Sequence, residues 1–545
     1  MSVYQRYGIL FLIGAVLFLP FLGAVHLFDW DEINFAECAR EMLVSKDYLR
    51  MQIDYQPFWE KPPLFIWLQA LSMGIFGVGE YAARFPNALV GIATLIALYH
   101  IGRKIADERR SLLWVGFYLA SWLPHFYFKT GIIDPLFNLL IVAAMYQLYR
   151  LRTAGSSWLH HAGWGGLFLG LAVLTKGPVA LIVSGITFLV YLLANRGLSG
   201  YRIGRLLVFA GVTLLVAASW FAVEVMNHGW WFVREFINYQ VGLFFQNIAD
   251  HEEPWYYHPI VLLIGCFPAS LLMIPTRSVA AHRQEGAQRD FKRLMWILFW
   301  VVLILFSIVK TKIVHYSSLC YFPITYLAAI QAEAFLEGRK RLHSAIKAGL
   351  LVIGTVWALI LIALPVAGLH KERLIPYIAD PFAVGNLQAA VPWSYAECIW
   401  GVLYLIGIWV GIWWLRSKPA RGVLVLFAVQ IVAIQVTLLH FTPKIEAYSQ
   451  RAAIEFFQSK ANEDCYVGVI GYKSYAHLFY TRKQPPVRKE ALKDDWLRNG
   501  PVDKPTYFVG KVDSKEAFIN DPNLEVISEK NGFVFLKRKN VNTNP

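Results

Sequence analysis

The stretch KAGLLVIGTVWALILIALPVAG, residues 347–368, decides the fold class, because it carries no charged residue after its first lysine. A helix of about 20 mainly apolar residues is long enough to cross a bilayer core about 30 Å thick. Inside lipid every backbone N–H and C=O group needs a partner within the protein, and a helix supplies these partners along its own length. The stretch therefore predicts a membrane-spanning helix.

Similar apolar runs recur along the chain. We predict thirteen spans, near residues 8–25, 84–102, 111–128, 131–149, 160–175, 178–195, 206–225, 258–275, 294–309, 316–335, 347–368, 397–415 and 422–440. The 545 residues are 57% hydrophobic and only 16% charged, whereas soluble domains are about 25% charged. The composition thus predicts an all-α polytopic bundle of about 13 transmembrane helices.

The formal net charge of +14 could indicate a nucleic-acid partner, but the positions of the basic residues favour another explanation. They concentrate in the connections after the even-numbered spans, at Arg103, Lys104, Arg150, Arg152, Arg202, Arg205, Arg283, Arg289, Arg339, Lys340, Arg416 and Arg421. Loops rich in lysine and arginine stay in the cytoplasm. We therefore predict a multi-pass protein of a bacterial inner membrane with a cytoplasmic N-terminus, a periplasmic C-terminal region and no nucleic-acid partner.

The first outer loop, residues 28–83, is too long for a simple connection. In DWDEINFAECAREMLVS, residues 29–45, Phe35, Ala39 and Met42 recur at helical spacing, with Glu37 and Glu41 on the other side. This pattern predicts a helix that lies along the outer membrane interface. The run PPLFIWLQALSMGIFG, residues 62–77, is too short and broken to predict a span, and we expect a second interfacial helix there.

The chain changes character after the transmembrane region, which we assign to residues 1–440. Alternating strands such as CYVGVIGY (465–472), PTYFVG (505–510) and GFVFLKR (532–538) are interleaved with helical patterns near 452–459 and 475–481. Residues 441–545 are thus predicted to form a small periplasmic α/β domain. The five cysteines show no paired spacing, which predicts neither a disulfide framework nor a thiolate metal site.

Charged residues at the predicted outer face break the positive-inside pattern. Acidic residues follow the first span at Asp29, Asp31 and Glu32, and cations occur at Lys61, Arg84, Lys176, Lys310 and Lys312. Each carboxylate could cap a helix, and each lysine could extend to water from a buried stem. A set of cations gathered from separate spans on one face indicates bound anionic groups instead. Anionic groups held at a lipid boundary suggest the phosphate of a long-chain lipid. A transferase at the outer face would need a membrane-tethered sugar donor, and a lipid phosphate that carries a sugar is one.

Several motifs carry a family resemblance. DEINFAECAREML (31–43), WEKPPLFIWL (59–68), GIIDPLF (131–137), TKGP (175–178), HEEPWYYHP (251–259) and VKTKIVHYSSLCYFP (309–323) follow one another in this order. Together they resemble the C-type (GT-C) superfamily of integral-membrane glycosyltransferases, and within it the lipid A 4-amino-4-deoxy-L-arabinose transferase (ArnT) family. The sequence departs from that pattern at Asn34 and Phe35, where an Arg-Tyr pair is expected, and at Val314 and His315, where a Pro-Thr step is expected.

The resemblance implies a substrate pair and a set of site residues. The donor would be undecaprenyl-phosphate aminoarabinose, the acceptor a lipid A phosphate in the membrane, and the outcome resistance to polymyxin and other cationic peptides. Asp31, with Glu32 and Asp134, would be the catalytic carboxylates. The donor phosphate would be bound by Lys61, Arg84, Lys176, Lys310, Lys312, Tyr316 and Tyr321. A lipid A phosphate is already largely ionised, so Asp31 is expected to orient the acceptor or the sugar amine.

A divalent metal is a further candidate, although the chemistry requires no cofactor. Glu60 and His251 lie on separate outer loops and could coordinate the same ion. Glu252 or Glu253 could complete the coordination. Glu60 could equally form a salt bridge with a neighbouring cation.

Three other functions remain open. A related enzyme could transfer a polyprenyl-phosphate hexose to a protein or glycan hydroxyl, with Asp31 as a true general base. A lipid transporter or flippase would place polar residues in the middle of its spans, whereas the charges here lie at the ends. A receptor or scaffold would not need so elaborate a first loop. We expect the transferase to be a monomer.

Overall fold

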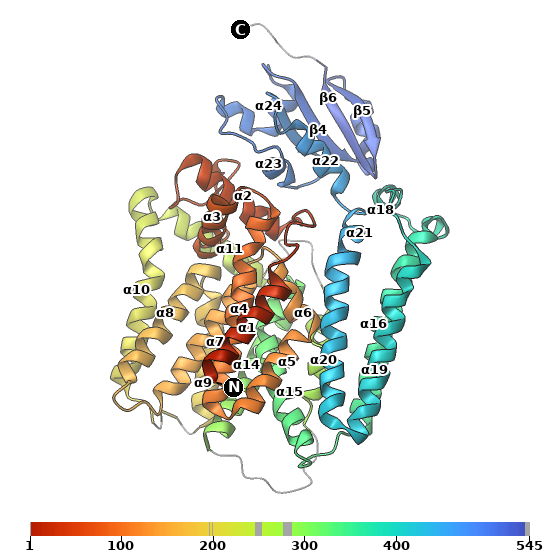
Figure 1. The fold of residues 1–545 in the computed structure, drawn as a ribbon. Coiled ribbons are helices and arrows are strands. Elements are labelled where there is room, and N and C mark those ends of the chain that lie inside the picture. Colours follow the sequence, from red (N-terminus) through yellow and green to blue (C-terminus); the bar gives the residue numbers. More distant parts are fainter. Residues whose placement is uncertain (1, 196, 199, 246–252, 276–285, 540–545) are drawn as a thin grey trace.

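The structure is a computed structural model that describes residues 2–195, 197–198, 200–245, 253–275 and 286–539. Helices form one large bundle, and a smaller domain containing a β-sheet caps one end of it (Figure 1). We call this the capped end of the bundle. It carries α2 (Asp31–Ser45), α3 (Leu64–Phe76) and the C-terminal domain.

Each of the thirteen apolar runs falls on a helix or a pair of helices. These elements are α1 (Val3–Phe18), α4 (Glu80–Ile105), α5 (Glu108–Leu119) with α6 (Trp122–Phe126), α7 (Asp134–Leu151), α8 (Trp158–Lys176), α9 (Val179–Ala194), α10 (Ile203–His228), α12 (Tyr257–Gly265) with α13 (Ala269–Leu272), α14 (Gly286–Ile308), α15 (Tyr321–Leu336), α16 (Ser344–Leu369), α19 (Ile399–Ser417) and α20 (Pro419–Val436). The predicted helical bundle is therefore confirmed.

Fewer than thirteen helices qualify as complete spans when both length and apolar composition are required. Within the described residues seven helices are long and apolar enough to cross a membrane, or eight if a bent pair counts as one span. That pair is 122–129 with α7, and the chain bends by 117° between its two parts. The remaining runs are shorter or interrupted, so a count of thirteen spans stays a prediction. The bend matters because it brings the start of α7 to the capped end, where the candidate site lies.

The two helices predicted in the first loop are both present. α2 begins at Asp31 and ends where Lys46 adopts a left-handed conformation, and a short hairpin of β1 (Gln52–Ile53) and β2 (Gln56–Pro57) leads toward α3. The polar side of α2 does not face water, however. Glu37 and Arg40 form a buried ion pair at 2.6 Å, and Glu41 is also buried. The C-terminal domain and the hairpin pack over this side, which hydrophobic spacing alone did not predict.

The C-terminal domain contains a four-stranded sheet in the order β3-β4-β6-β5. The strands are β3 (Tyr466–Ile470), β4 (Thr506–Lys511), β5 (Leu524–Lys530) and β6 (Phe533–Arg538). β3 and β4 are parallel, and the other two pairs are antiparallel. α22 (Arg451–Lys460) and α23 (Ala476–Tyr480) lie between the sheet and the bundle (Figure 1). The predicted α/β character is confirmed, and β5 is a strand that the sequence did not reveal, since most of its residues are exposed.

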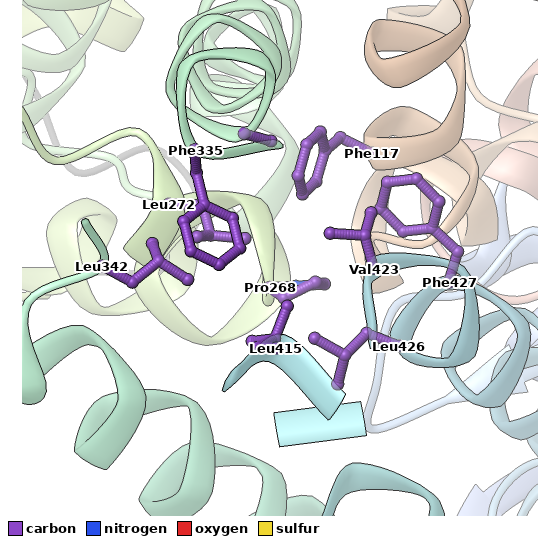
Figure 2. A pocket seen from close by; sticks show the side chains of 10 residues that line it. Phe117, Pro268, Leu272, Phe335, Leu342, Leu415, Val423, Leu426 and Phe427 are labelled. Carbon is purple, nitrogen blue, oxygen red and sulfur yellow. The ribbon is translucent and has the colours of Figure 1, made fainter. Parts of the chain in front are cut away.

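The lower bundle is packed with apolar side chains. A void of about 10 Å³ lies among Phe117, Leu272, Phe335 and their neighbours, with no polar lining (Figure 2). Such a volume holds about one water molecule at most, and an apolar void of this size stays dry. It can accommodate no substrate.

All five cysteines are free thiols.

Candidate active site

The site is assembled where four elements meet at the capped end. Asp31 is the first residue of α2, Asp134 is the first residue of α7, and Lys176 is the last residue of α8. His315 lies in the short 3-10 helix η2 (Val314–Cys320). Carboxylates in a first helical turn are stabilised by the helix dipole, as is a cation in the last turn. The helix dipoles thus stabilise Asp31, Asp134 and Lys176 at their own helix ends, and the tertiary fold brings these ends together.

The four side chains form one connected cluster. His315 Nε2 lies 3.3 Å from a carboxylate oxygen of Asp31 and 3.8 Å from one of Asp134. Lys176 Nζ donates to the other oxygen of Asp134 at 2.5 Å and lies 5.0 Å from the ring centre of Tyr316. An imidazole between two carboxylates, beside a lysine, gives a compact patch that combines acidic and cationic groups. Asp31 remains about one-third exposed, so a ligand can reach it.

The surroundings of Asp31 determine its ionisation. Burial raises the pKa of this carboxyl, but the hydrogen bond and charge of His315, with the charges of Lys61 and Lys176, outweigh burial and bring the pKa to about 2. Asp31 is therefore a carboxylate at neutral pH. A group with so low a pKa is a weak base but a strong acceptor for a cationic or N–H donor.

Lys61 and Glu60 lie next to the cluster on the segment before α3. Lys61 Nζ is 5.3 Å from the ring centre of Tyr239 in α11 (Trp231–Phe245), and the Tyr239 hydroxyl donates to Glu60 Oε2 at 2.9 Å. His251, the suggested metal partner of Glu60, lies outside the described residues. Within the part of the chain that the structure describes, no group of three His, Cys, Asp or Glu side chains is placed to hold a metal ion. The metal site thus stays a prediction.

Glu32 and Arg84 pair with each other rather than facing the site. Arg84 makes five hydrogen bonds, two to Glu32 and three to the carbonyls of Leu22, Val25 and His26. A guanidinium has five N–H groups, so none remains for a phosphate. Glu32 also accepts from the backbone N–H groups of Phe28 and Gly131. The pair fastens the segment between α1 and α2 to α4.

The other predicted phosphate ligands occupy different positions. Tyr316 lies beside Lys176, as described above. Lys310 is exposed and Lys312 is buried. Tyr321 is buried against Tyr127, with ring centres 6.1 Å apart. The structure therefore gathers Lys61, Lys176 and Tyr316 around Asp31 and Asp134, whereas every N–H group of Arg84 already has another partner.

The C-terminal domain holds the segment that carries Asp31. The backbone N–H of Leu27 donates to the Tyr480 hydroxyl at 2.8 Å, and Ser474 Oγ donates to Asp29. Lys473 Nζ lies 5.1 Å from the ring centre of Trp30. Because Asp29 and Trp30 directly precede α2, these contacts fix the approach to Asp31. Sequence reasoning did not assign this role to the domain, since no local pattern indicates a contact over more than 400 residues.

A cavity of about 350 Å³ adjoins the cluster. Apolar side chains that include Phe21, Val25 and Leu439 line it, together with Lys129 and His315. His315 therefore belongs both to the acidic cluster and to the cavity wall. The sequence identified His315 only as a departure from the family pattern, and its central position emerges from the fold.

Known proteins match this chain in sequence and in fold. A family model described as dolichyl-phosphate-mannose-protein mannosyltransferase matches residues 60–223. A protein of Pectobacterium carotovorum named undecaprenyl phosphate-alpha-4-amino-4-deoxy-L-arabinose arabinosyl transferase is 29% identical over 432 residues, 73% of this chain and 75% of the relative. A Pseudomonas aeruginosa protein of the same name is 27% identical over 75% of each chain.

A solved structure extends the likeness to the whole molecule. The crystal structure of ArnT from Cupriavidus metallidurans bound to undecaprenyl phosphate superposes with a TM-score of 0.77 at 19% identity, and all of both chains is covered. At this identity the match shows the fold. The resemblance predicted from the motifs is thus confirmed: the chain has the fold of ArnT from Cupriavidus metallidurans and is similar in sequence to proteins named as aminoarabinose transferases.

Proposed function

We propose that this enzyme transfers 4-amino-4-deoxy-L-arabinose from undecaprenyl phosphate to a phosphate of lipid A, at the periplasmic face of a bacterial inner membrane. The observation that carries the proposal is the cluster of Asp31, His315, Asp134 and Lys176 beside Lys61. The sequence similarity to proteins named for this sugar and this carrier lipid supports it.

The cationic side of the cluster suits the donor. Lys61 and Lys176 would bind the phosphate of the carrier lipid and stabilise the charge that grows on it as the sugar leaves. Tyr316, beside Lys176, can donate a hydrogen bond to the same group. Because these residues supply the positive charge, the chemistry requires no metal.

The acidic side suits the sugar and the acceptor. The low pKa of Asp31 makes this residue a weak base, which favours an acceptor that is already ionised over a hydroxyl that must lose a proton. A phosphate monoester fits this requirement. Asp31 and Asp134 are also placed to attract the ammonium group of an aminosugar. These features favour lipid A over a protein or glycan hydroxyl as acceptor.

The orientation follows from the basic loops. Arg103, Lys104 and the corresponding residues of the other even-numbered connections would face the cytoplasm. The capped end would then lie in the periplasm, and a monomer contains every residue that the reaction uses.

Mass spectrometry of lipid A tests the proposal. Cells that express the enzyme together with its donor should contain lipid A whose mass is increased by aminoarabinose, and cells that lack the gene should not. Increased survival on polymyxin should accompany the change, because the added amine offsets phosphate charge. Unmodified lipid A together with newly glycosylated proteins or glycans would instead support the hydroxyl-acceptor enzyme.

A further inference from the structure

His315 lies between the two carboxylates of the active-site cluster. Its Nε2 atom is 3.3 Å from an oxygen of Asp31 and 3.8 Å from one of Asp134. The first distance is at the long end of the hydrogen-bonding range, and the second is beyond it. Asp134 already has Lys176 as a partner at 2.5 Å, whereas Asp31 is the carboxylate that a ligand can reach. The contact with Asp31 is therefore the one that bears on the reaction.

The short helix η2, which carries His315, is held by buried hydrogen bonds. The Ser317 hydroxyl lies 3.1 Å from His258 Nδ1, and Asn138 Nδ2 donates to Ser318 Oγ at 2.8 Å. These four side chains are at most 4% exposed. A side chain on so firm a support keeps its position when a ligand enters. The imidazole is thus placed beside Asp31 before any substrate binds.

The groups around His315 determine the state of Asp31. The titratable side chains there are those of Asp31, Asp134, Lys176, Tyr127, Tyr316 and His258. Burial raises the pKa of the Asp31 carboxyl, and the hydrogen bond and charge of His315 are the largest contributions that bring it down to about 2. Without the imidazole, burial would remain and its strongest opponent would be gone. Asp31 would then accept a proton more readily.

The two classes of acceptor differ by one proton. An ionised phosphate oxygen can attack the anomeric carbon directly and form a new C–O bond. The bond from that carbon to the donor phosphate oxygen breaks, and its electron pair leaves with undecaprenyl phosphate. A hydroxyl acceptor must also give up its proton, and Asp31 is the exposed carboxylate that could take it. The basicity of Asp31 therefore decides whether a hydroxyl can react.

We propose that His315 is the positioning residue that restricts this enzyme to ionised acceptors. Its contact with Asp31 keeps that carboxylate from taking a proton, so that a phosphate reacts and a hydroxyl does not. This inference rests on the proposed function and identifies what selects the acceptor. His315 acts through Asp31, which serves as a fixed negative charge in the parent enzyme.

Initial rates with two acceptors that differ only in a phosphate test this role. The acceptors are lipid A carrying a single phosphate and the same lipid with that phosphate removed, which leaves a hydroxyl at the same position. The purified parent should prefer the phosphorylated lipid by at least about a hundredfold in kcat/KM. His315→Met, which has a side chain of similar length but no N–H group, should reduce this preference at least about tenfold by gaining activity on the hydroxyl.

Further variants identify the cause of such a gain. His315→Gln keeps an N–H group at a similar reach and should retain most of the preference. Asp31→Asn combined with His315→Met should lose the gained transfer, because the released base is then absent. In His315→Met the rate on the hydroxyl should rise with pH as Asp31 ionises, since this acceptor does not titrate itself. His160→Gln, at an exposed histidine near the start of α8, should behave as the parent does.

The outcomes separate this inference from the proposed function. A phosphate-selective parent whose selectivity survives in His315→Met overturns the inference alone. Equal losses on both acceptors in His315→Met, with a lower melting temperature, would show a structural role and also overturn it. A parent that uses the hydroxyl as readily as the phosphate overturns both. Phosphatidic acid and diacylglycerol form a second matched pair. A parent that ignores lipid A but shows His315-dependent selectivity for phosphatidic acid would disprove the proposed function and leave the role of His315 intact.

Discussion

At the scale of single residues, some charged side chains at the active site are fully used in contacts within the protein, and others remain accessible to a ligand. Asp31, Asp134 and Lys176 interact with one another and with His315, yet Asp31 stays partly exposed. Arg84 has the same formal charge as Lys176 but no free N–H group. A charged residue at the membrane boundary can thus serve either a ligand or the scaffold, and its partners decide which.

Asp31→Asn should reduce transfer by about a hundredfold or more, because it removes a fixed negative charge at the reacting centre and keeps the shape of the side chain. The melting temperature should stay close to that of the parent. Initial rates with purified enzyme and both lipid substrates measure the effect. Parental activity in this variant would leave Asp31 as a helix-capping residue only.

Lys61→Gln should lower turnover but not stability, whereas Arg84→Gln should lower stability. Lys61→Gln removes a phosphate contact worth about 1.5 to 3 kcal/mol, so turnover should fall about tenfold or more without loss of stability. Arg84→Gln leaves the Glu32 carboxylate buried without its partner, which should lower the free energy of unfolding by about 3 to 5 kcal/mol.

Rate measurements and thermal unfolding of both variants, with Lys104→Gln as an exposed control, test this contrast. A stable Arg84→Gln protein that has lost binding of polyprenyl phosphate would return Arg84 to the set of donor ligands. A fully active Lys61→Gln protein would remove Lys61 from that set.

At the scale of elements, the segment between α1 and α2 is held from two sides. Glu32 and Arg84 attach it to α4, and α23 with the preceding loop attaches it to the C-terminal domain. Asp29 is part of the second attachment. Burial raises the pKa of its carboxyl to about 6, despite hydrogen bonds from Ser474 and the backbone of Tyr475. Folding therefore makes this carboxyl easier to protonate than it is in the unfolded chain.

This raised pKa predicts a pH-dependent stability. The contribution of Asp29 is fully present below its unfolded pKa of 3.8 and is lost as the pH rises through about 6. Asp29→Asn should remove this dependence and make the protein more stable at pH 8, by at most about 3 kcal/mol. Melting temperatures of the parent and the variant between pH 4 and pH 8 measure the difference. Parallel curves for the two proteins would show that Asp29 does not titrate in this range.

At the scale of the whole molecule, the elements that supply the active-site cluster meet at the capped end of the bundle (Figure 1). α2 and α7 begin there, and α8 ends there. The C-terminal domain covers the same end and so lies on the same side of the membrane as the reaction.

Reporter fusions should locate this side. Alkaline phosphatase, which is active only in the periplasm, should be active when fused after Pro545 and inactive when fused after Ala106, at the end of α4. Green fluorescent protein at the same two positions should give the reverse pattern, because it fluoresces when folded in the cytoplasm. Activity of one reporter at both positions would contradict the orientation inferred from the basic loops.

The sequence by itself determined the membrane class, the positions of the helices and the residues worth examining. Hydropathy is a local property that adds along the chain, so all thirteen apolar runs fall on helices. Alternation likewise identified β3, β4 and β6, but not the mostly exposed β5. The motifs around Asp31, Lys61 and Asp134 indicated the family, because they combine several residues in a fixed order.

Only the tertiary structure decided which charges are partners. Glu32 meets Arg84 across 52 positions, and Asp29 meets Ser474 across 445. His315 joins Asp31 to Asp134, and Lys129 is buried without a partner among the described residues. The energy of a charge depends on distance and burial in three dimensions, and neither quantity is a local property of the chain. A basic residue can therefore be identified as a scaffold residue at Arg84, or as a ligand-binding candidate at Lys61, only once the fold is known.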